Sequence, residues 1–248
     1  MKVIGVIPAR YGSTRLKAKV LAKIQGKPMI QHVWERAKKS QLLDDLVIAC
    51  DDRRTLEAAQ EFGARAVMTS AKHPSGSDRV AEVVRSLDAE IVINIQGDEP
   101  LIQHKVIDQL AEVLLKDSSC VMATVIKGVD DLKELSNPNV VKVVVDKNRD
   151  ALYFSRSLIP FKRNDEASGE CQYFKHLGIY GYRKSFLMNF VKWPKSALEK
   201  TEQLEQLRVL EAGYKIKTVV TDIETISVDT KEDLQKVEAL LSQGKRYG

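Results

Sequence analysis

The 248-residue chain exceeds the ~150 residues of a typical domain, so its length allows one large domain or two small ones. Hydrophobic residues make up 44% and charged residues 29%, which excludes a disordered protein, a collagen-like repeat and a small disulfide scaffold. Basic residues outnumber acidic ones by 39 to 34, and this net charge of +5 favours anionic small molecules rather than nucleic acid as partners.

The compartment is predicted from what the sequence lacks. No apolar run approaches the ~18–20 residues that a membrane span requires, so no membrane partner is expected. The apolar run from Val3 to Pro8 has no cleavage pattern behind it, which argues against a signal peptide. The three cysteines form no C-x-x-C pair, so neither a disulfide framework nor a zinc site is indicated. These features predict a cytoplasmic protein.

Short runs rich in valine and isoleucine alternate with helical patterns in the first half of the chain. The predicted strands are 3–7, 46–50, 66–68 and 91–95. The predicted helices are 28–40, 53–62, 78–87 and 104–116. Strands that are apolar on both faces and alternate with helices of ~10–15 residues predict a parallel sheet that is covered on both sides.

After about residue 120 the alternation is less regular. Strands are expected at 121–126, 140–145, 151–154, 175–182, 217–220 and 226–228, helices at 197–212 and 231–242, and a polar loop at 160–172. We therefore predict an α/β fold with a doubly wound, mostly parallel, Rossmann-like sheet. It would form a single domain over residues 1–248, with a smaller α+β subregion inserted at about 121–215.

A basic loop, residues 8–19, follows the first predicted strand, where ligands bind in open α/β sheets. Its cations and hydroxyls are Arg10, Ser13, Thr14, Arg15, Lys17 and Lys19. Arginine can grip phosphate oxygens in pairs and lysine adds a point charge, so the loop suits a polyphosphate. A solvated basic surface would have the same composition, so charge alone leaves phosphate binding open. The Walker motif and the G-x-G-x-x-G motif are absent, and the latter absence argues against a dinucleotide-dependent dehydrogenase.

Two distant aspartates each follow a predicted strand. Asp98 comes after strand 91–95 through Gln96 and Gly97, and Asp229 directly follows the run 226–228. Carboxylate oxygens suit Mg²⁺, which a reaction at the phosphorus of a nucleoside triphosphate needs. Turn or helix capping explains each aspartate equally well, and their spacing in the sequence cannot show that they meet.

A series of ordered motifs resembles a known family along nearly the whole chain. The motifs are 7–16, 26–30, 73–79, 94–102, 152–156, 176–180, 204–208 and 228–230. Together they resemble the 3-deoxy-D-manno-octulosonate (KDO) cytidylyltransferases. The chain departs from that pattern in one loop, because the family usually has Pro-Gly-Lys-Pro where this sequence has Lys17-Ala18-Lys19-Val20. The lost glycine and prolines put the path of this loop in question.

The resemblance implies a nucleotidyltransferase that moves the CMP group of CTP to KDO, releases pyrophosphate and uses Mg²⁺. It also implies a cytoplasmic homodimer that serves lipopolysaccharide biosynthesis, with sugar binding and dimer contacts in the subregion 121–215. A transferase for 8-amino-KDO or another sugar acid, and a nucleotide-binding module without catalysis, remain as alternatives. A Rossmann-like phosphatase is a further alternative, against which the missing D-x-D motif argues.

Carried over residue by residue, the resemblance implies three groups of site residues. The catalytic group is Lys19, Asp98 and Asp229, and the metal ligands are Asp98 and Asp229. The nucleotide-binding group is Pro8, Ala9, Arg10, Ser13, Arg15, Lys19, Ser75, Gly76, Arg79 and Gln96. The sugar-binding group is Arg156, His176, Tyr180, Glu205 and Gln206. Without the resemblance, a lone histidine on a strand is more often structural, and Glu205 and Gln206 on an amphipathic helix would face water.

Overall fold

The computed structural model of the chain describes residues 1–12, 16, 18–163 and 172–242. The part of its main sheet that the first half of the chain forms is parallel, as the alternating pattern predicts. The parallel strands lie in the order β6 (Ile91–Asn94), β1 (Val3–Ala9), β4 (Asp45–Cys50) and β5 (Arg65–Met68). Their side chains alternate between two buried apolar clusters, with Ile7 in one and Val6 in the other.

The second half of the sheet is built around one long antiparallel strand. This strand, β10 (Tyr173–Arg183), pairs antiparallel with β6 and with β7 (Met122–Val129). Beyond β7 the sheet ends with β11 (Lys217–Val220), which is parallel to β7. Two further strands, β8 (Lys142–Val145) and β9 (Ala151–Ser155), extend antiparallel from β10. The sheet is therefore mixed but mostly parallel over its main path, and the predicted α/β class is confirmed.

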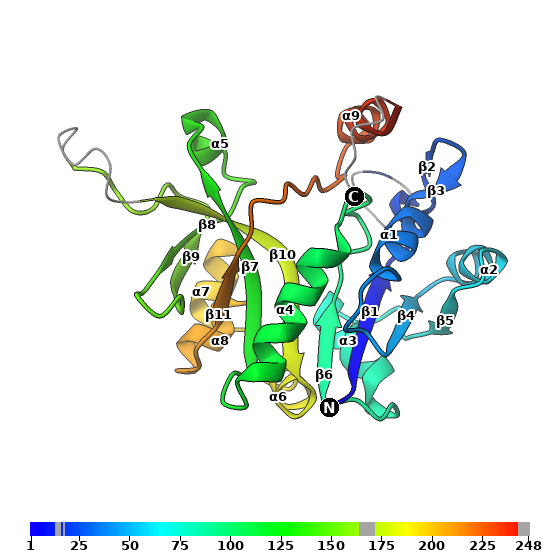
Figure 1. The fold of residues 1–248 in the computed structure, drawn as a ribbon, viewed down its shortest axis with the longest axis horizontal. Coiled ribbons are helices and arrows are strands. Elements are labelled where there is room, and N and C mark those ends of the chain that lie inside the picture. Colours follow the sequence, from blue (N-terminus) through cyan, green and yellow to red (C-terminus); the bar gives the residue numbers. More distant parts are fainter. Residues whose placement is uncertain (13–15, 17, 164–171, 243–248) are drawn as a thin grey trace.

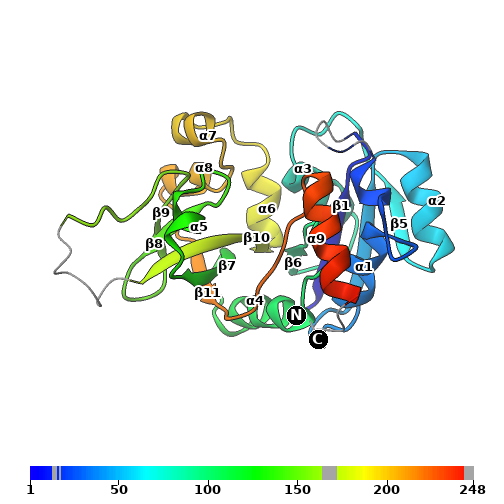
Figure 2. The same cartoon turned by 90° about the horizontal axis from the view of Figure 1, so that it is seen from above.

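Helices cover both faces of the sheet (Figures 1 and 2). One face carries α1 (Met29–Ala37) and α4 (His104–Lys116), and α2 (Arg53–Glu61) contributes to the same apolar cluster. The other face carries α3 (Gly76–Arg85), α6 (Lys184–Phe190) and α8 (Leu207–Glu211). The short elements are η1 (Lys19–Leu21), the hairpin β2 (Lys23–Ile24) and β3 (Lys27–Pro28), α5 (Leu132–Ser136) and α7 (Ala197–Glu202). No helix in the described part of the chain combines the length and hydrophobicity needed to cross a membrane.

Two predicted elements differ in the structure. The helix predicted at 197–212 is interrupted after α7, because Gln203 adopts a left-handed conformation with φ 54°. The turn that results lets Leu204 and Leu207 both enter the core. The strand predicted at 226–228 is wrong, because residues 221–230 form no ladder with any described strand. Its apolar residues instead pack against the last helix of the chain, and Val228 is fully buried there.

The segment 221–230 leads from β11 to the last helix, α9 (Lys231–Ser242), and so crosses between the two halves of the molecule (Figure 1). α9 lies over the β2–β3 hairpin, and Val237 packs there with Ile24 and Met29. The C-terminal part of the chain therefore returns to the N-terminal half, beside the end of β1.

Candidate functional site

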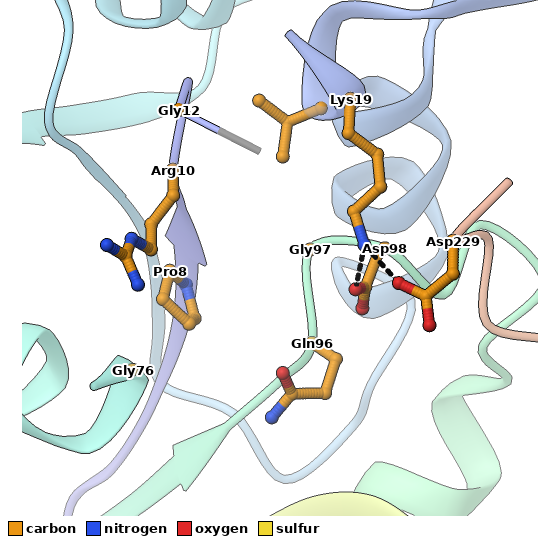
Figure 3. A pocket seen from close by; sticks show the side chains of 10 residues that line it. Pro8, Arg10, Gly12, Lys19, Gly76, Gln96, Gly97, Asp98 and Asp229 are labelled. Atoms are coloured by element: carbon orange, nitrogen blue, oxygen red, sulfur yellow. Dashed lines mark hydrogen bonds and ion pairs between the residues drawn. The ribbon is translucent and has the colours of Figure 1, made fainter. Parts of the chain in front are cut away.

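A cavity of about 370 Å³ lies at the carboxyl ends of β1 and β6, the edge at which an open α/β sheet binds ligands. Figure 3 shows the side chains that surround it. The described residues that line it are Pro8, Arg10, Gly12, Lys19, Val20, Gly76, Gln96, Gly97, Asp98 and Asp229. Seven of the residues predicted for the site are therefore in one cavity, although they come from four separate parts of the sequence.

Asp98 and Asp229 meet at one side of this cavity. The Lys19 ammonium lies between them, with Nζ 2.6 Å from Asp98 Oδ2 and 2.9 Å from Asp229 Oδ1. These two oxygens contact the same nitrogen atom, so they are at most about 5.5 Å apart. The two carboxylates, 131 residues apart in the sequence, are thus neighbours in the fold.

Hydrogen bonds of the main chain fix the positions of the two aspartates. The Val228 backbone N–H donates to the Asp98 carbonyl at 2.9 Å, which joins the loop after β6 to the segment 221–230. The Asp229 backbone N–H donates to Asp233 Oδ2 at 3.0 Å, at the start of α9. Gly97 is needed in the same loop, because a Cβ there would lie 2.7 Å from the Pro8 carbonyl oxygen.

Three lining residues, Gly12, Val20 and Gly97, were not predicted as site residues. Each is adjacent to or near a predicted one in the sequence, and none has a polar side chain. No signal of charge or hydrogen-bonding chemistry could therefore have singled them out. The position of Gly97 between Gln96 and Asp98 is the one local sign of its importance, because glycine permits close backbone approach.

Burial and the adjacent carboxylates have opposite effects on the pKa of Lys19. Burial alone would lower the pKa of Lys19, but the adjacent carboxylates of Asp98 and Asp229 outweigh it and raise that pKa above its usual value. The side chain of Lys19 is 12% exposed, against 26% for Asp98 and 32% for Asp229. The carboxylates are therefore paired with a charged ammonium and are still accessible from the cavity.

The carboxylates of Asp98 and Asp229 would supply only part of the ligand set of a Mg²⁺ ion. Two carboxylates are hard oxygen donors, as Mg²⁺ prefers, and the ion usually keeps waters and substrate phosphate oxygens as its other ligands. In the described part of the chain no group of three or more His, Cys, Asp or Glu side chains gathers as a ready-made metal cage. The residues present therefore fit a site that a metal would complete together with phosphate oxygens and water.

The N-terminus of α3 borders the cavity, but its residues have different environments. Gly76 lines the cavity, whereas Ser75 caps α3 by accepting a hydrogen bond from the Asp78 backbone N–H at 3.2 Å. The Arg79 side chain is fully buried and points to Asp51, 3.2 Å from its Oδ2, and to the carbonyl of Ser70. Arg79 thus anchors the loop before α3 and lies outside the cavity lining, so its contact with a nucleotide stays a prediction.

The remaining nucleotide-binding predictions have varied outcomes. Ala9 is buried in β1 with no exposed surface and is not part of the lining. Ser13 and Arg15 lie outside the described residues. Gln96 lines the cavity and its amide donates to the Gly178 carbonyl at 2.7 Å, which connects the loop after β6 to β10.

Two of the predicted sugar-binding residues lie side by side on β10. The rings of His176 and Tyr180 are 5.2 Å apart, and Phe154 packs edge-on against His176. His176 Nε2 is 2.8 Å from the Thr124 hydroxyl, and burial lowers the pKa of His176 to about 3. Burial also raises the pKa of Tyr180. Both side chains are therefore neutral near pH 7.

The other three predicted sugar-binding residues differ in their contacts. Glu205 accepts a hydrogen bond from the Ser77 hydroxyl and pairs with Arg208 at 3.2 Å, and burial raises the pKa of Glu205. Arg156 donates through Nε to the Glu202 carbonyl at 2.8 Å. Gln206 is 3% exposed, and its side-chain Nε2 has no partner among the described residues.

Comparison with known proteins gives a consistent result over the chain. A family model described as "Cytidylyltransferase" matches residues 4–218. The 3-deoxy-manno-octulosonate cytidylyltransferase of Geotalea daltonii is 50% identical over 98% of this chain and 100% of its own length. The protein of the same name from Thermodesulfovibrio yellowstonii is 49% identical over 98% of this chain and 99% of its own.

Solved structures agree with the sequence relatives. A CMP:2-keto-3-deoxy-manno-octonic acid synthetase complexed with CTP has a TM-score of 0.93 and 45% identity, covering 98% of this chain and 100% of its own. A Leptospira borgpetersenii cytidylyltransferase, at 17% identity and a TM-score of 0.66, covers 98% of this chain and 87% of its own, and shares the fold.

Proposed function

Because the chain belongs to the cytidylyltransferase family, we propose that it transfers the CMP group of CTP to the anomeric hydroxyl of KDO and releases pyrophosphate. The observation that carries this proposal is the cavity at the end of β1, in which Lys19, Asp98 and Asp229 converge. The curated relatives and the structure complexed with CTP supply the nature of the two substrates.

The nucleotide would lie with its triphosphate toward the basic side of the cavity. Arg10 lines the cavity and can bind phosphate oxygens in a bidentate manner, and Lys19 can add a point charge. Gly76 and Gly97 let the backbone approach a ligand closely, which suits recognition of the base and the ribose. The sugar acid would enter from β10, where Gln96 contacts Gly178 and where the His176 and Tyr180 rings adjoin.

Asp98 and Asp229 would hold Mg²⁺. When bound, this ion supplies a Lewis acid that neutralises charge on the reacting phosphate and lowers the pKa of the attacking hydroxyl. The protein's own contribution is positional: the loop after β6 and the segment 221–230 hold the two carboxylates beside the basic residues of the cavity. Orientation of CTP and KDO by these fixed elements would supply much of the rate acceleration.

Replacing one carboxylate tests the proposed role of the metal ligands. We expect Asp98→Asn to reduce pyrophosphate release from CTP and KDO by at least about a thousandfold, because the variant loses a charged oxygen ligand of the cation. The measurement is a coupled pyrophosphate assay in Mg²⁺, with circular dichroism to verify the fold. Asp88→Asn is the matched control, because Asp88 is exposed on the loop after α3. Near-normal turnover by Asp98→Asn would contradict the assignment.

Acceptor choice is tested in the same assay. Pyrophosphate release from CTP is compared with KDO, 8-amino-KDO and other sugar acids as acceptors, and KDO is expected to give the highest kcat/KM. Binding of CTP without release of pyrophosphate for any acceptor would instead favour a nucleotide-binding module.

The biological setting is also part of the proposal. We infer a cytoplasmic homodimer whose product serves lipopolysaccharide biosynthesis. The segment after β9 supports a partner surface in the subregion 121–215, because Phe161 is 84% and Leu158 41% exposed. Light scattering on the purified protein, which would give twice the mass of 27.9 kDa for a dimer, tests the assembly.

A further inference from the structure

The ammonium group of Lys19 lies where the two proposed metal ligands converge. It donates hydrogen bonds to Asp98 Oδ2 and to Asp229 Oδ1, and all three side chains face the same cavity (Figure 3). Little water reaches Lys19, whose side chain is 12% exposed. The carboxylates therefore provide the main compensation for its charge.

A divalent ion and this ammonium would compete for the same oxygens. Mg²⁺ bonds carboxylate oxygens at about 2.0–2.1 Å and demands near-octahedral geometry. An ion that contacted both aspartates would lie within a few ångströms of Nζ, in a partly buried site where like charges repel strongly. The arrangement of Lys19 in the structure and a metal ion shared by the two carboxylates are thus alternatives.

We propose that Lys19 is a placeholder cation: it occupies the position of the divalent metal between Asp98 and Asp229 in the substrate-free protein, and must leave before the metal binds both. This inference rests on the proposed function, because it takes these two aspartates as the metal ligands. In this alternation, one pair of carboxylates binds an ammonium first and a metal afterwards.

The surrounding backbone allows this exchange without large movement. Two hydrogen bonds hold the aspartates in position. The Val228 N–H donates to the Asp98 carbonyl, and the Asp229 N–H donates to the Asp233 carboxylate at the start of α9. These main-chain bonds do not involve the lysine ammonium. Lys19 begins η1, and its long side chain can reorient by rotation about its own bonds while the carboxylates stay in place.

The nucleotide would provide the reason for Lys19 to move. A triphosphate bound in the cavity beside Arg10 brings several negative charges within reach of a flexible ammonium. Lys19 would then pair with phosphate, and the released carboxylates would receive the metal. Metal binding at the two aspartates would consequently be weak in the free protein and strong once the nucleotide is bound.

The test measures Mn²⁺ binding by the full chain without nucleotide or sugar, using electron paramagnetic resonance of free Mn²⁺. Lys19→Met and Lys19→Gln remove the charge, and Gln retains a polar side chain in case the apolar variant fails to fold. We expect both to bind Mn²⁺ at least about tenfold more tightly than the unmodified protein. Adding Asp98→Asn to either variant should abolish the gain. Lys23→Met is the matched control, because it removes the same charge at an exposed position four residues away.

The outcomes separate this inference from the proposed function. Unchanged Mn²⁺ affinity in both folded Lys19 variants would overturn the placeholder role. The same titration with CTP present tests the metal ligands themselves: if Asp98→Asn left Mn²⁺ binding to the CTP complex unchanged, the metal assignment of the proposed function would fall. A gain of affinity equal to that of Lys23→Met would also overturn the placeholder role, because it would reflect net charge alone.

Discussion

Ala18 has a backbone conformation that few alanines adopt. Its φ of 53° and ψ of 36° place it in the left-handed region, directly before Lys19. A Cβ makes this conformation unfavourable by about 1–2 kcal/mol, and glycine adopts it readily. The sequence pattern shows a lost glycine at this position but leaves the path of the loop open, and the structure shows that the left-handed turn is kept without it.

We expect Ala18→Gly to stabilise the protein by up to about 1 kcal/mol, because relief of the strained φ exceeds the extra entropy that glycine has in the unfolded chain. The free energy of unfolding in urea measures the effect. Ala22→Gly serves as the control, since Ala22 has an ordinary φ of −56° and the same change there should be destabilising. A destabilised Ala18→Gly would show that the left-handed turn carries no strain.

The Ser77 side chain joins two elements that lie far apart in the sequence. Ser77, 2% exposed in the first turn of α3, donates its hydroxyl to Glu205 in the turn between α7 and α8. The neighbouring Gly76 lines the cavity at the ends of β1 and β6. The contact therefore links the cavity to the part of the chain in which sugar-binding residues are predicted.

Loss of the Ser77 hydroxyl should destabilise the protein. We expect Ser77→Ala to lower the unfolding free energy by about 1–3 kcal/mol, because it deprives a largely buried carboxylate of a hydrogen bond. Ser77→Thr should retain most of the stability, since it keeps the hydroxyl. Thermal denaturation compares both with Ser86→Ala, which changes an exposed serine at the end of the same helix. Equal stability of the Ser77→Ala and Ser86→Ala variants would show that the bond contributes nothing.

The elements that the sequence predicts poorly are those decided by tertiary contacts. The four parallel strands and their helices follow from local apolar runs, and the structure contains them. The single helix predicted at 197–212 is divided into α7 and α8, because a turn at Gln203 brings Leu204 into the core, and no local periodicity indicates that turn. α6 was not predicted, although Phe186, Leu187 and Phe190 have the spacing of a buried helical face.

The stability of the whole molecule should depend on pH through His176. In the folded protein burial lowers the pKa of His176 to about 3, so the imidazole stays neutral where the unfolded chain, with a pKa of 6.5, takes up a proton. This contribution to stability is complete above pH 6.5 and is lost as the pH falls toward 3. The loss is at most about 1.4 kcal/mol per pH unit.

A His176→Gln variant lacks this proton uptake. The difference in unfolding free energy between the unmodified protein and the variant should therefore shrink by about 1–2 kcal/mol between about pH 7 and pH 5. Urea denaturation at the two pH values measures this difference. His104→Gln is the control, because His104 is the first residue of α4 and is half exposed. A constant difference would show that the folded protein protonates His176 as readily as the unfolded chain.

The convergence of the site residues, unlike the parallel strands, does not follow from local sequence patterns. Apolar runs place Asp98 and Asp229 after strand-like segments, but their meeting depends on the return of segment 221–230 across the molecule, which no local pattern indicates. The antiparallel course of β10 between β6 and β7 has the same origin, since its neighbours are set by long-range pairing. The predicted division into one domain with an inserted subregion stays a prediction.

The return of segment 221–230 also bears on how the molecule is made. All four parallel strands and Asp98 lie within the first hundred residues, whereas Asp229 comes from the opposite end of the chain. A ribosome extending the polypeptide from its N-terminus could expose the first carboxylate on a partly formed sheet long before its partner is synthesised. Under the proposed function, a nascent chain would therefore gain its second metal ligand only after segment 221–230 has been synthesised.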